Sequence, residues 1–394
     1  MNLILRRIAL LSLLLGLPCL AVDGDNRHHF KSLWQEAENY TAQGKFLQSD
    51  STLNILLADV NLTSKQEDLT YMLLERNAYL SGDYQKLLDV RHQRFGDKWE
   101  ESPYFITLAS FPKERVTRPD DDVKIEYYRD LLKGHEEKGG LLRIPVAIGG
   151  KQEYFILDNG IAVFSAVSES FAKEHGINAF SVDGKVEGTT GTVNMSLGYA
   201  DSLSIGSLKL YNLVFSIIPD QPQMDSVVKI DAILGGNFFR QVGDIVLHRD
   251  EKMIVFPYQQ RRHNSNITIN DIGQHFIKAE VFGFTNPFQI DLGATSTSLN
   301  YNFYNEHKAL VRRRFKKTTI NLGGIGGVSE VDVYDVPELP LKMCGKEFKV
   351  YDTHIESQPK NGTNLGSGVI GNDIIDAFSK VTLNLKDMYL LIED

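Results

Sequence analysis

Two short apolar segments of this chain each end in an aspartate, and a glycine follows two positions later. The first segment reads Phe-Ile-Leu-Asp-Asn-Gly and contains Asp158 and Gly160; the second reads Phe-Gln-Ile-Asp-Leu-Gly and contains Asp291 and Gly293. A buried strand gains nothing from a carboxylate at its end, because removing that charge from water is costly. The repeated arrangement therefore indicates that the two acids meet. Two carboxyl groups in contact share one proton, which suits general acid–base chemistry.

The sequence around the two acids is repeated in the same order. Each acid follows a strand-like segment and precedes a predicted helix, at 168–175 or 301–310, and then a Gly/Thr-rich stretch. Hairpins are predicted at 144–157, 244–256 and 381–392. At a nearly equal interval after each acid comes an apolar pair that ends in Gly235 or Gly371. The Gly/Thr-rich stretches are Gly188-Thr189-Thr190-Gly191 and Gly323-Gly324-Ile325-Gly326-Gly327. A repeat longer than the period of solenoid units indicates two duplicated lobes.

Residues 141–394 resemble a bilobal aspartic peptidase of the pepsin/retropepsin superfamily, in its bacterial exported form. The resemblance rests on the apolar-Asp-x-Gly turn, the glycine-rich segment and the apolar-apolar-Gly strand, which occur in this order and twice. It implies a mainly β, two-lobed acid-protease-like β-barrel fold with lobes at 141–260 and 261–394. It also implies hydrolysis of peptide or protein substrates by a water that one ionised and one protonated carboxyl activate.

The resemblance assigns a role to each repeated motif. Asp158 and Asp291 would form the catalytic pair, and neither a metal ion nor another cofactor is implied. The residues expected to support the pair are Asn159, Gly160, Gly293, Thr295, Gly235 and Gly371. The residues expected to cover the substrate as flaps are Thr189, Thr190, Gly191, Gly323, Gly324 and Gly326.

The chain departs from the family pattern beside the acids. The family usually has Thr or Ser directly after each acid, where the hydroxyl cross-links the two turns, but this chain has Asn159 and Leu292. Asn159 can still form such a bond, whereas Leu292 cannot. Thr295 keeps a hydroxyl that would donate to Asp291, and Ala162 has lost it in the first lobe. Two alternatives stay open: a peptide-binding module with impaired catalysis, and an exported structural protein whose acids cap turns.

The first residues are typical of a secretory signal peptide. Arg6 and Arg7 precede an apolar run at 8–17 and a small-residue site near Ala21, so residues 1–21 are predicted to be removed. The apolar run is too short to cross a membrane as an ordinary helix. The protein is therefore expected to be exported, to the periplasm or the extracellular space. Attachment to lipid through Cys19 is the alternative.

Residues 27–100 are predicted to form a helical domain, because apolar residues such as Leu33, Ala37 and Tyr40 recur at helical spacing. The segment around Gly82 resembles the turn and second helix of a tetratricopeptide-type hairpin, which leaves open a packing domain, a prodomain and a partner-binding array. Residues 101–140 contain prolines and an acidic run, which predict a linker with a helix at 125–132.

The composition disfavours several other functions. The formal net charge is −9 and the basic run at 312–317 is typical of a solvated face, so nucleic-acid binding is not expected. The histidines form no His-Glu-x-x-His motif, which argues against the common zinc-peptidase pattern. Cys344 would be the one cysteine left after signal removal, so no internal disulfide is expected. Nothing in the sequence predicts the oligomeric state.

Overall fold

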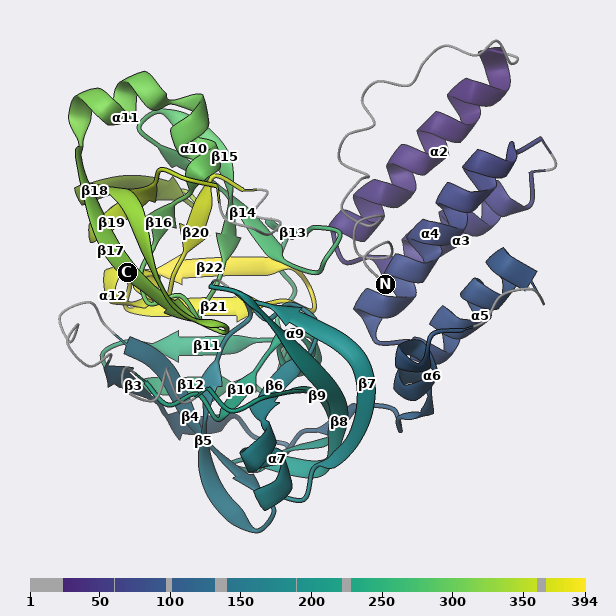
Figure 1. The fold of residues 1–394 in the computed structure, drawn as a ribbon, viewed down its shortest axis with the longest axis horizontal. Coiled ribbons are helices and arrows are strands. Elements are labelled where there is room, and N and C mark those ends of the chain that lie inside the picture. Colours follow the sequence, from purple (N-terminus) through teal and green to yellow (C-terminus); the bar gives the residue numbers. More distant parts are fainter. Residues whose placement is uncertain are drawn as a thin grey trace. The chain divides into compact units, whose positions relative to one another are not determined.

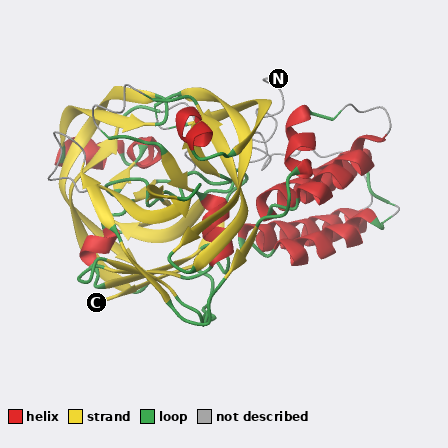
Figure 2. Cartoon of the chain, turned by 90° about the horizontal axis from the view of Figure 1, so that it is seen from below, coloured by secondary structure: helices red, strands yellow, loops and turns green. Residues whose placement is uncertain are grey.

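The structure is a computed structural model (Figure 1). It describes residues 24–59, 61–96, 101–131, 140–188, 190–221, 228–359 and 366–394. The predicted signal peptide, Cys19 and the predicted flap residue Thr189 lie outside the described residues. The chain divides into two compact units, Met1–Ser110 with Ile269–Gly273, and Phe111–Thr268 with Gln274–Asp394. Figure 2 shows that helices dominate the first unit and strands the second.

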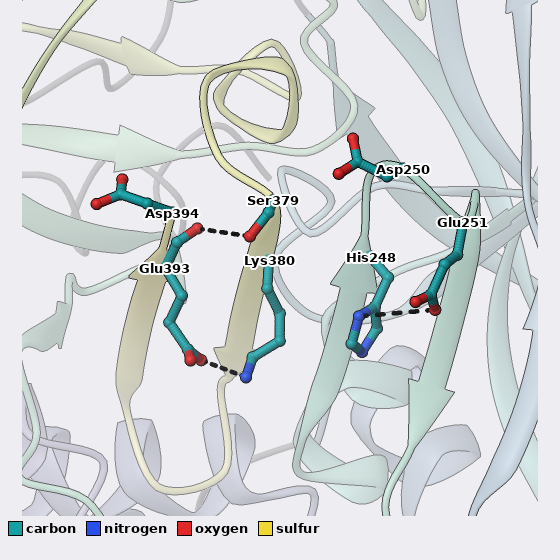
Figure 3. A pocket seen from close by; sticks show the side chains of 7 residues that line it. All are labelled: His248, Asp250, Glu251, Ser379, Lys380, Glu393 and Asp394. Atoms are coloured by element: carbon teal, nitrogen blue, oxygen red, sulfur yellow. Dashed lines mark hydrogen bonds and ion pairs between the residues drawn. The ribbon is translucent and has the colours of Figure 1, made fainter.

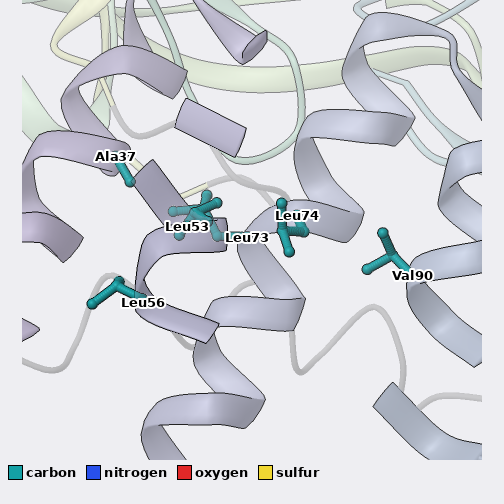
Figure 4. Close-up of a cluster of buried hydrophobic side chains, with 6 residues drawn as sticks. All are labelled: Ala37, Leu53, Leu56, Leu73, Leu74 and Val90. Carbon is teal, nitrogen blue, oxygen red and sulfur yellow. The ribbon is translucent and has the colours of Figure 1, made fainter. Parts of the chain in front are cut away.

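The helical unit is a series of helices in which each packs against the next. They are α2 (Gly24–Ala42), α3 (Phe46–Leu57), α4 (Ser64–Ser81), α5 (Tyr84–Phe95) and α6 (Pro103–Ser110). The buried apolar side chains between α2, α3, α4 and α5 are Ala37, Leu53, Leu56, Leu73, Leu74 and Val90 (Figure 4). The predicted helical domain is thus present, and its tetratricopeptide-like character stays a prediction.

Local signals fix the ends of these helices. Thr63 and Gln66 form a reciprocal capping box at the start of α4, which satisfies two backbone amides that lack a partner within the helix. Gly82 ends α4 with a φ of 76°, in the left-handed region that favours glycine. The Asp83 side chain then accepts from the Lys86 amide and starts α5. The turn that the sequence placed at Gly82 is therefore confirmed.

The prediction of a linker with a helix at 125–132 is wrong. Beyond α6 the chain forms β1 (Arg115–Thr117), β2 (Val123–Glu126) and β3 (Tyr128–Leu131). Buried and exposed residues alternate along β2, which is the period of a half-buried strand. These strands pair with β9 (Leu208–Ile218), β12 (Met253–Phe256) and β4 (Gly140–Ile148), respectively. The segment from Phe111 onward is therefore part of the β unit.

The first repeat forms a sheet in the order β1-β9-β6-β10-β5-β4-β8-β7, with β3 on β4. Its remaining strands are β4 (Gly140–Ile148), β5 (Lys151–Leu157), β6 (Ser165–Ser168), β7 (Asn178–Glu187), β8 (Thr192–Ile205), β9 (Leu208–Ile218) and β10 (Ala232–Leu234). The short helices α7 (Glu169–Glu174) and α9 (Gly236–Val242) follow β6 and β10. The expected β4–β5 hairpin and the expected helix after the first acid are confirmed.

The second repeat forms a sheet in the order β13-β14-β15-β20-β16-β19-β18-β17. Its strands are β13 (Ile267–Ile269), β14 (His275–Val281), β15 (Phe284–Ile290), β16 (Ser298–Leu299), β17 (Lys316–Gly324), β18 (Gly327–Met343), β19 (Lys346–Glu356) and β20 (Gly368–Ile370). Its helices are α10 (Tyr301–Glu306), α11 (Lys308–Arg314) and α12 (Ile374–Ala377). The helix expected at 301–310 is therefore two short helices that meet at His307.

A third sheet takes strands from both repeats, in the order β2-β12-β11-β21-β22. The strands not yet named are β11 (Ile245–His248), β12 (Met253–Phe256), β21 (Lys380–Asn384) and β22 (Tyr389–Glu393). Both hairpins were predicted from the sequence, and the β11–β21 pairing joins them. The protein is thus mainly β with N-terminal helices.

The same strand pairing positions each acid. β5, which leads to Asp158, lies parallel to β10, and β15, which leads to Asp291, lies parallel to β20. The amide of Asp158 donates to the carbonyl of Leu234 at 3.1 Å, and the amide of Asp291 donates to that of Ile370 at 3.0 Å. Each acid therefore leaves its sheet where the apolar-apolar-Gly strand ends.

Candidate functional site

The structure brings Asp158 and Asp291 into contact. A hydrogen bond joins the two carboxyl groups. Gly160 lies so close to the Asp291 carboxyl that a β carbon at position 160 would overlap it, and Gly293 lies in the same way against Asp158. Glycine is required at both positions because the turns cross at this point.

Backbone amides surround the two carboxyl groups. The amides of Gly160 and Ile161 donate to Asp158 Oδ1 at 2.8 and 3.3 Å, and the amide of Gly293 donates to Asp291 Oδ1 at 2.9 Å. Asp291 also accepts from the amides of Ala294 and Gly160. Both aspartates are half-buried as whole residues.

The expected role of Thr295 is not observed. Within the part of the chain that the structure describes, its hydroxyl donates no hydrogen bond to Asp291. The backbone amides of Gly293 and Ala294 supply donors to that carboxyl instead. The hydroxyl that is missing at Ala162 therefore does not leave Asp158 with fewer side-chain hydroxyl donors than Asp291 has.

Burial raises the pKa of both carboxyl groups, because a charge is poorly solvated among protein atoms. The pKa of Asp158 is raised further by the charge of Asp291 and by the hydrogen bond to it. For Asp291, the hydrogen bond from Asp158 and the backbone amides oppose the rise in pKa. The two groups titrate as one unit. The larger set of donors around Asp291 favours the charge on Asp291 and the shared proton on Asp158.

Asn159 cross-links the two turns. Its Nδ2 donates to the carbonyl of Ile290 at 2.6 Å, and its Oδ1 accepts from the amide of Leu292 at 2.9 Å. These backbone groups flank Asp291 on both sides, so one amide side chain fixes the opposite acid. Asn159 and Leu292 are both buried. Leu292 cannot form the cross-link expected of Thr or Ser, but the two turns are nevertheless in contact.

On the Leu292 side, Asn372 and Arg129 provide support that the sequence did not reveal. The Leu292 carbonyl accepts from Asn372 Nδ2 at 3.1 Å, and this nitrogen also donates to the carbonyl of Gly140 at 3.1 Å. Arg129, on β3, donates to Asn372 Oδ1 at 3.0 Å. The position of Asn372 directly after Gly371 was a usable signal. Arg129 gave none, because it lies in a segment that was expected to be helical.

Gly235 and Gly371 lie where a side chain would collide with the loops that follow the acids. A β carbon at Gly235 would overlap the carbonyl of Phe164, and one at Gly371 would come within 2.6 Å of the Ser296 carbonyl carbon. The amides of Gly235 and Gly371 donate to the hydroxyls of Ser165 and Thr297, in each case at 3.1 Å.

The two Gly/Thr-rich stretches form hairpin tips, between β7 and β8 and between β17 and β18, and the tips touch each other. The Thr190 hydroxyl lies 3.3, 3.2 and 3.0 Å from the carbonyl oxygens of Gly324, Ile325 and Gly327. A β carbon at Gly326 would come within 2.7 Å of the Gly191 amide nitrogen. Four predicted flap residues thus meet, whereas Gly323 pairs with Val328 inside its own hairpin.

The tip of the second hairpin also reaches the first sheet. Ile325 packs with Ile161 and Ile230 against a buried apolar cluster, hereafter the Ile325 cluster. The buried members of the Ile325 cluster are Leu141, Ile156, Ala166, Val228 and Ile233. Ile161 stands three positions after Asp158, so the Ile325 cluster lies beside that acid.

The polar depression in Figure 3 is separate from the acids. Its lining residues are His248, Asp250, Glu251, Ser379, Lys380, Glu393 and Asp394, at the ends of third-sheet hairpins. Lys380 pairs with Glu393 at 2.6 Å, and His248 lies 3.9 Å from Glu251. The residues placed by the structure include no cluster of His, Cys, Asp and Glu arranged to hold a metal ion. The helices among them also include none with the length and apolar character needed to cross a membrane.

Comparisons with known proteins find similarity to a family model and to solved structures. Residues 144–238 match the family model described as aspartyl protease, a stretch that contains Asp158 but not Asp291. The crystal structure of basic 7S globulin from soybean is similar at 12% identity over 70% of this chain and 95% of that chain, with a TM-score of 0.39. A retropepsin-like aspartic protease from Rickettsia conorii is similar at 17% identity over 38% of this chain and 90% of that chain, with a TM-score of 0.24. A sequence search of the curated proteins finds no match.

Asn159→Ala should destabilise the β unit by about 2–4 kcal/mol, because the Ile290 carbonyl and the Leu292 amide lose a buried partner. Urea unfolding, monitored by far-ultraviolet circular dichroism, measures the change in unfolding free energy. Asn194→Ala, at an exposed position on β8, is the matched control. Equal stability of the two variants would show that the cross-link does not hold the turns together.

The raised pKa of Asp158 predicts a pH-dependent gain in stability for Asp158→Asn. The folded protein holds the Asp158 proton more tightly than the unfolded chain, so the stability from that proton is full below the ordinary aspartate pKa and is lost as pH rises through the raised pKa. The asparagine keeps a hydrogen-bond donor and does not titrate. Compared with the native protein, the variant should gain unfolding free energy as pH rises from the ordinary aspartate pKa, about 4, through the raised pKa of Asp158.

Urea unfolding at a series of pH values measures this gain. Asp250→Asn is the control, because the pKa of the exposed Asp250 is lowered by its hydrogen bond to Arg249, which gives no gain as pH rises. A stability difference between Asp158→Asn and the native protein that stays constant with pH would mean that Asp158 titrates normally.

Proposed function

We propose that this protein is an exported aspartic endopeptidase that hydrolyses peptide bonds with Asp158 and Asp291. The observation that carries the proposal is the close approach of the two turns, which places the Asp291 carboxyl against Gly160 and the Asp158 carboxyl against Gly293. The aspartyl protease match over residues 144–238 supports it. The signal-peptide pattern of residues 1–21 supports export, and the two β repeats, 141–260 and 261–394, would be the lobes of the enzyme.

The geometry suits the activation of a water molecule between the acids. Ionised Asp291 takes a proton from the water, and the resulting oxygen nucleophile attacks the peptide carbonyl carbon. Protonated Asp158 donates its hydrogen bond, and then its proton, to the carbonyl oxygen. Asp291, which now carries the proton taken from the water, gives it to the leaving nitrogen as the C–N bond breaks. Asp158 takes a proton back from a hydroxyl of the tetrahedral intermediate, which yields one carboxylic acid and one amine and restores the shared-proton state of the pair.

The hairpin tips would cover the substrate. Their strands offer backbone groups to which an extended peptide can add as a further strand. Thr190 and Ile325 hold the tips together in the free protein, so a substrate would enter after these contacts open. The Ile325 cluster beside Asp158 would then receive an apolar side chain of the substrate.

A peptide-binding module with impaired catalysis is the second candidate. The observation that favours it is the closed contact between the tips, because Thr190 reaches three carbonyl groups of the opposite hairpin. Such a module would bind the same extended peptides without cleaving them. The helical unit, which was predicted to be tetratricopeptide-like, would recruit a partner in either case.

Purified protein should cleave peptides in a library between about pH 3 and about pH 7, because the reaction needs one ionised and one protonated carboxyl. The rate should fall at low pH, where both groups are protonated, and at high pH, where both are ionised. Pepstatin should inhibit the cleavage, and Asp158→Asn and Asp291→Asn should abolish it. Asp250→Asn should keep it. Cleavage that survives both substitutions would belong to another site, and binding without cleavage would select the second candidate.

Ile325→Ala should lower KM about fivefold for peptides with a branched aliphatic side chain near the cut, because the substrate no longer displaces an apolar side chain worth about 1 kcal/mol. The rate constant kcat should change little. Val328→Ala is the matched control, since Val328 lies on the same hairpin and is exposed. Identical KM values in the two variants would mean that Ile325 does not occupy the binding region.

A further inference from the structure

The two repeats fix the glycine behind each acid with different side chains. In the first repeat, Ser165 Oγ accepts from the Gly235 amide and donates to Asn237 Oδ1 at 2.8 Å. In the second repeat, Thr297 Oγ1 accepts from the Gly371 amide and donates to Asp373 Oδ1 at 2.7 Å. Asn237 and Asp373 each stand two positions after their glycine, so they occupy equivalent places.

An asparagine in this place brings a requirement that an aspartate does not. A buried amide group carries two N–H donors, and each needs an acceptor. Asn237 Nδ2 donates to the carbonyl of Val214 at 2.8 Å and to Glu114 Oε1 at 2.7 Å. The same Glu114 oxygen accepts from the Val214 amide at 2.7 Å. In the second repeat, Asp373 has no such donors, because its second oxygen accepts from the Thr297 amide at 2.8 Å.

Glu114 comes from outside the repeat that it supports. It stands directly before β1, in the segment from Phe111 to Leu131, which belongs to the β unit but precedes the first repeat. Its position is fixed by the pairing of β1 with β9 and by the hydrogen bond from Asn212 Nδ2 to the Lys113 carbonyl at 3.0 Å. Arg115 lies over the ring of Tyr211, 3.8 Å from its centre, which adds a cation–π contact at the same place.

We propose that Glu114 is a positioning residue for Asp158 in the reaction proposed above. It acts through Asn237 and Ser165 on Gly235, at the end of the strand whose Leu234 carbonyl holds the Asp158 amide. Without Glu114, Asn237 Nδ2 keeps only the Val214 carbonyl as an acceptor, so the side chain is held less firmly against Ser165. The end of β10 and the turn that carries Asp158 then lose their fixed position relative to Asp291.

A positioning role for Glu114 also limits where the functional β unit can begin. The sequence left open whether the helical region is a prodomain that is removed. Because Glu114 belongs to the support of Asp158, a cut that leaves the site intact must fall before residue 114. The segment from Phe111 to Leu131 then contributes directly to the support of the site.

The test compares Glu114→Ala with Glu114→Gln in the full chain. Glutamine keeps an oxygen that can accept from both Asn237 and Val214, whereas alanine keeps none. Glu126→Ala is the control, because Glu126 is an exposed glutamate on the nearby strand β2. Two quantities are measured: the hydrogen-exchange rates of the Asp158 and Gly235 amides by NMR, and kcat and KM on a cleaved peptide.

Glu114→Ala should speed exchange at Asp158 and Gly235 about tenfold or more, with no change at the Asp291 and Gly371 amides, which report on the second repeat. It should lower kcat about tenfold or more with KM held within about twofold, since it misplaces an acid without touching substrate. Glu114→Gln and Glu126→Ala should leave both quantities near the native values.

Two results would overturn the proposal. Unchanged exchange at Asp158 and Gly235 in Glu114→Ala would mean that Glu114 does not act on the turn. Equal acceleration in both repeats would mean that it supports general stability. If neither the native protein nor any variant cleaves a peptide, the proposed enzymatic function fails. The hydrogen-exchange rates still decide whether Glu114 positions Asp158.

Discussion

The contact between the Asp158 and Asp291 carboxyl groups is the constraint on which the rest of the β unit depends. Two carboxylates in contact repel each other unless they share a proton, and their burial adds a desolvation cost. The fold offsets these costs locally. Gly160 and Gly293 allow the turns to cross, backbone amides point at the oxygens, and Asn159 binds the backbone on both sides of Asp291.

The support for the two acids is not symmetric, although the strands around them are. On the first turn, Arg240 donates to the carbonyls of Ala162 and Val163 at 2.8 and 2.7 Å, and Glu114 completes the partners of Asn237. On the second turn, Asn372 and Arg129 hold the Leu292 backbone. Two of these side chains, Glu114 and Arg129, come from the segment that precedes the first repeat. The repeats have therefore diverged, and the segment from Phe111 to Leu131 supplies a supporting side chain to each of them.

The sequence predicted what depends on local pattern. Short-range signals predicted the Asp-x-Gly turns, the glycines behind them, the hairpins and the apolar strands. The duplication of these signals indicated that the two turns belong together. Asn159 was recognised as able to bond, but its two partners lie in the other repeat, so their identity could not be read from neighbouring residues. The family pattern assigned Thr295 as a hydrogen-bond donor to Asp291, but in the structure backbone amides beside Asp291 are the donors.

The segment at 115–131 shows a different limit. Its strands are three or four residues long and lie among prolines and acids, so the local pattern indicated a linker, yet pairing with β9, β12 and β4 makes strands of them. Because their contacts are distant in sequence, Glu114 and Arg129 could not be foreseen as parts of the site. Non-local pairing also decides that the two hairpin tips meet, which glycine content alone did not establish.

The most direct test of the account is a carboxyl ¹³C NMR titration of Asp158 and Asp291 in the native protein. A shared proton predicts that the two resonances titrate together in two steps, one of them well above the ordinary aspartate range, and that Asp291→Asn removes the coupling. Two independent titrations near the ordinary aspartate pKa would contradict the claim that the acids are neighbours.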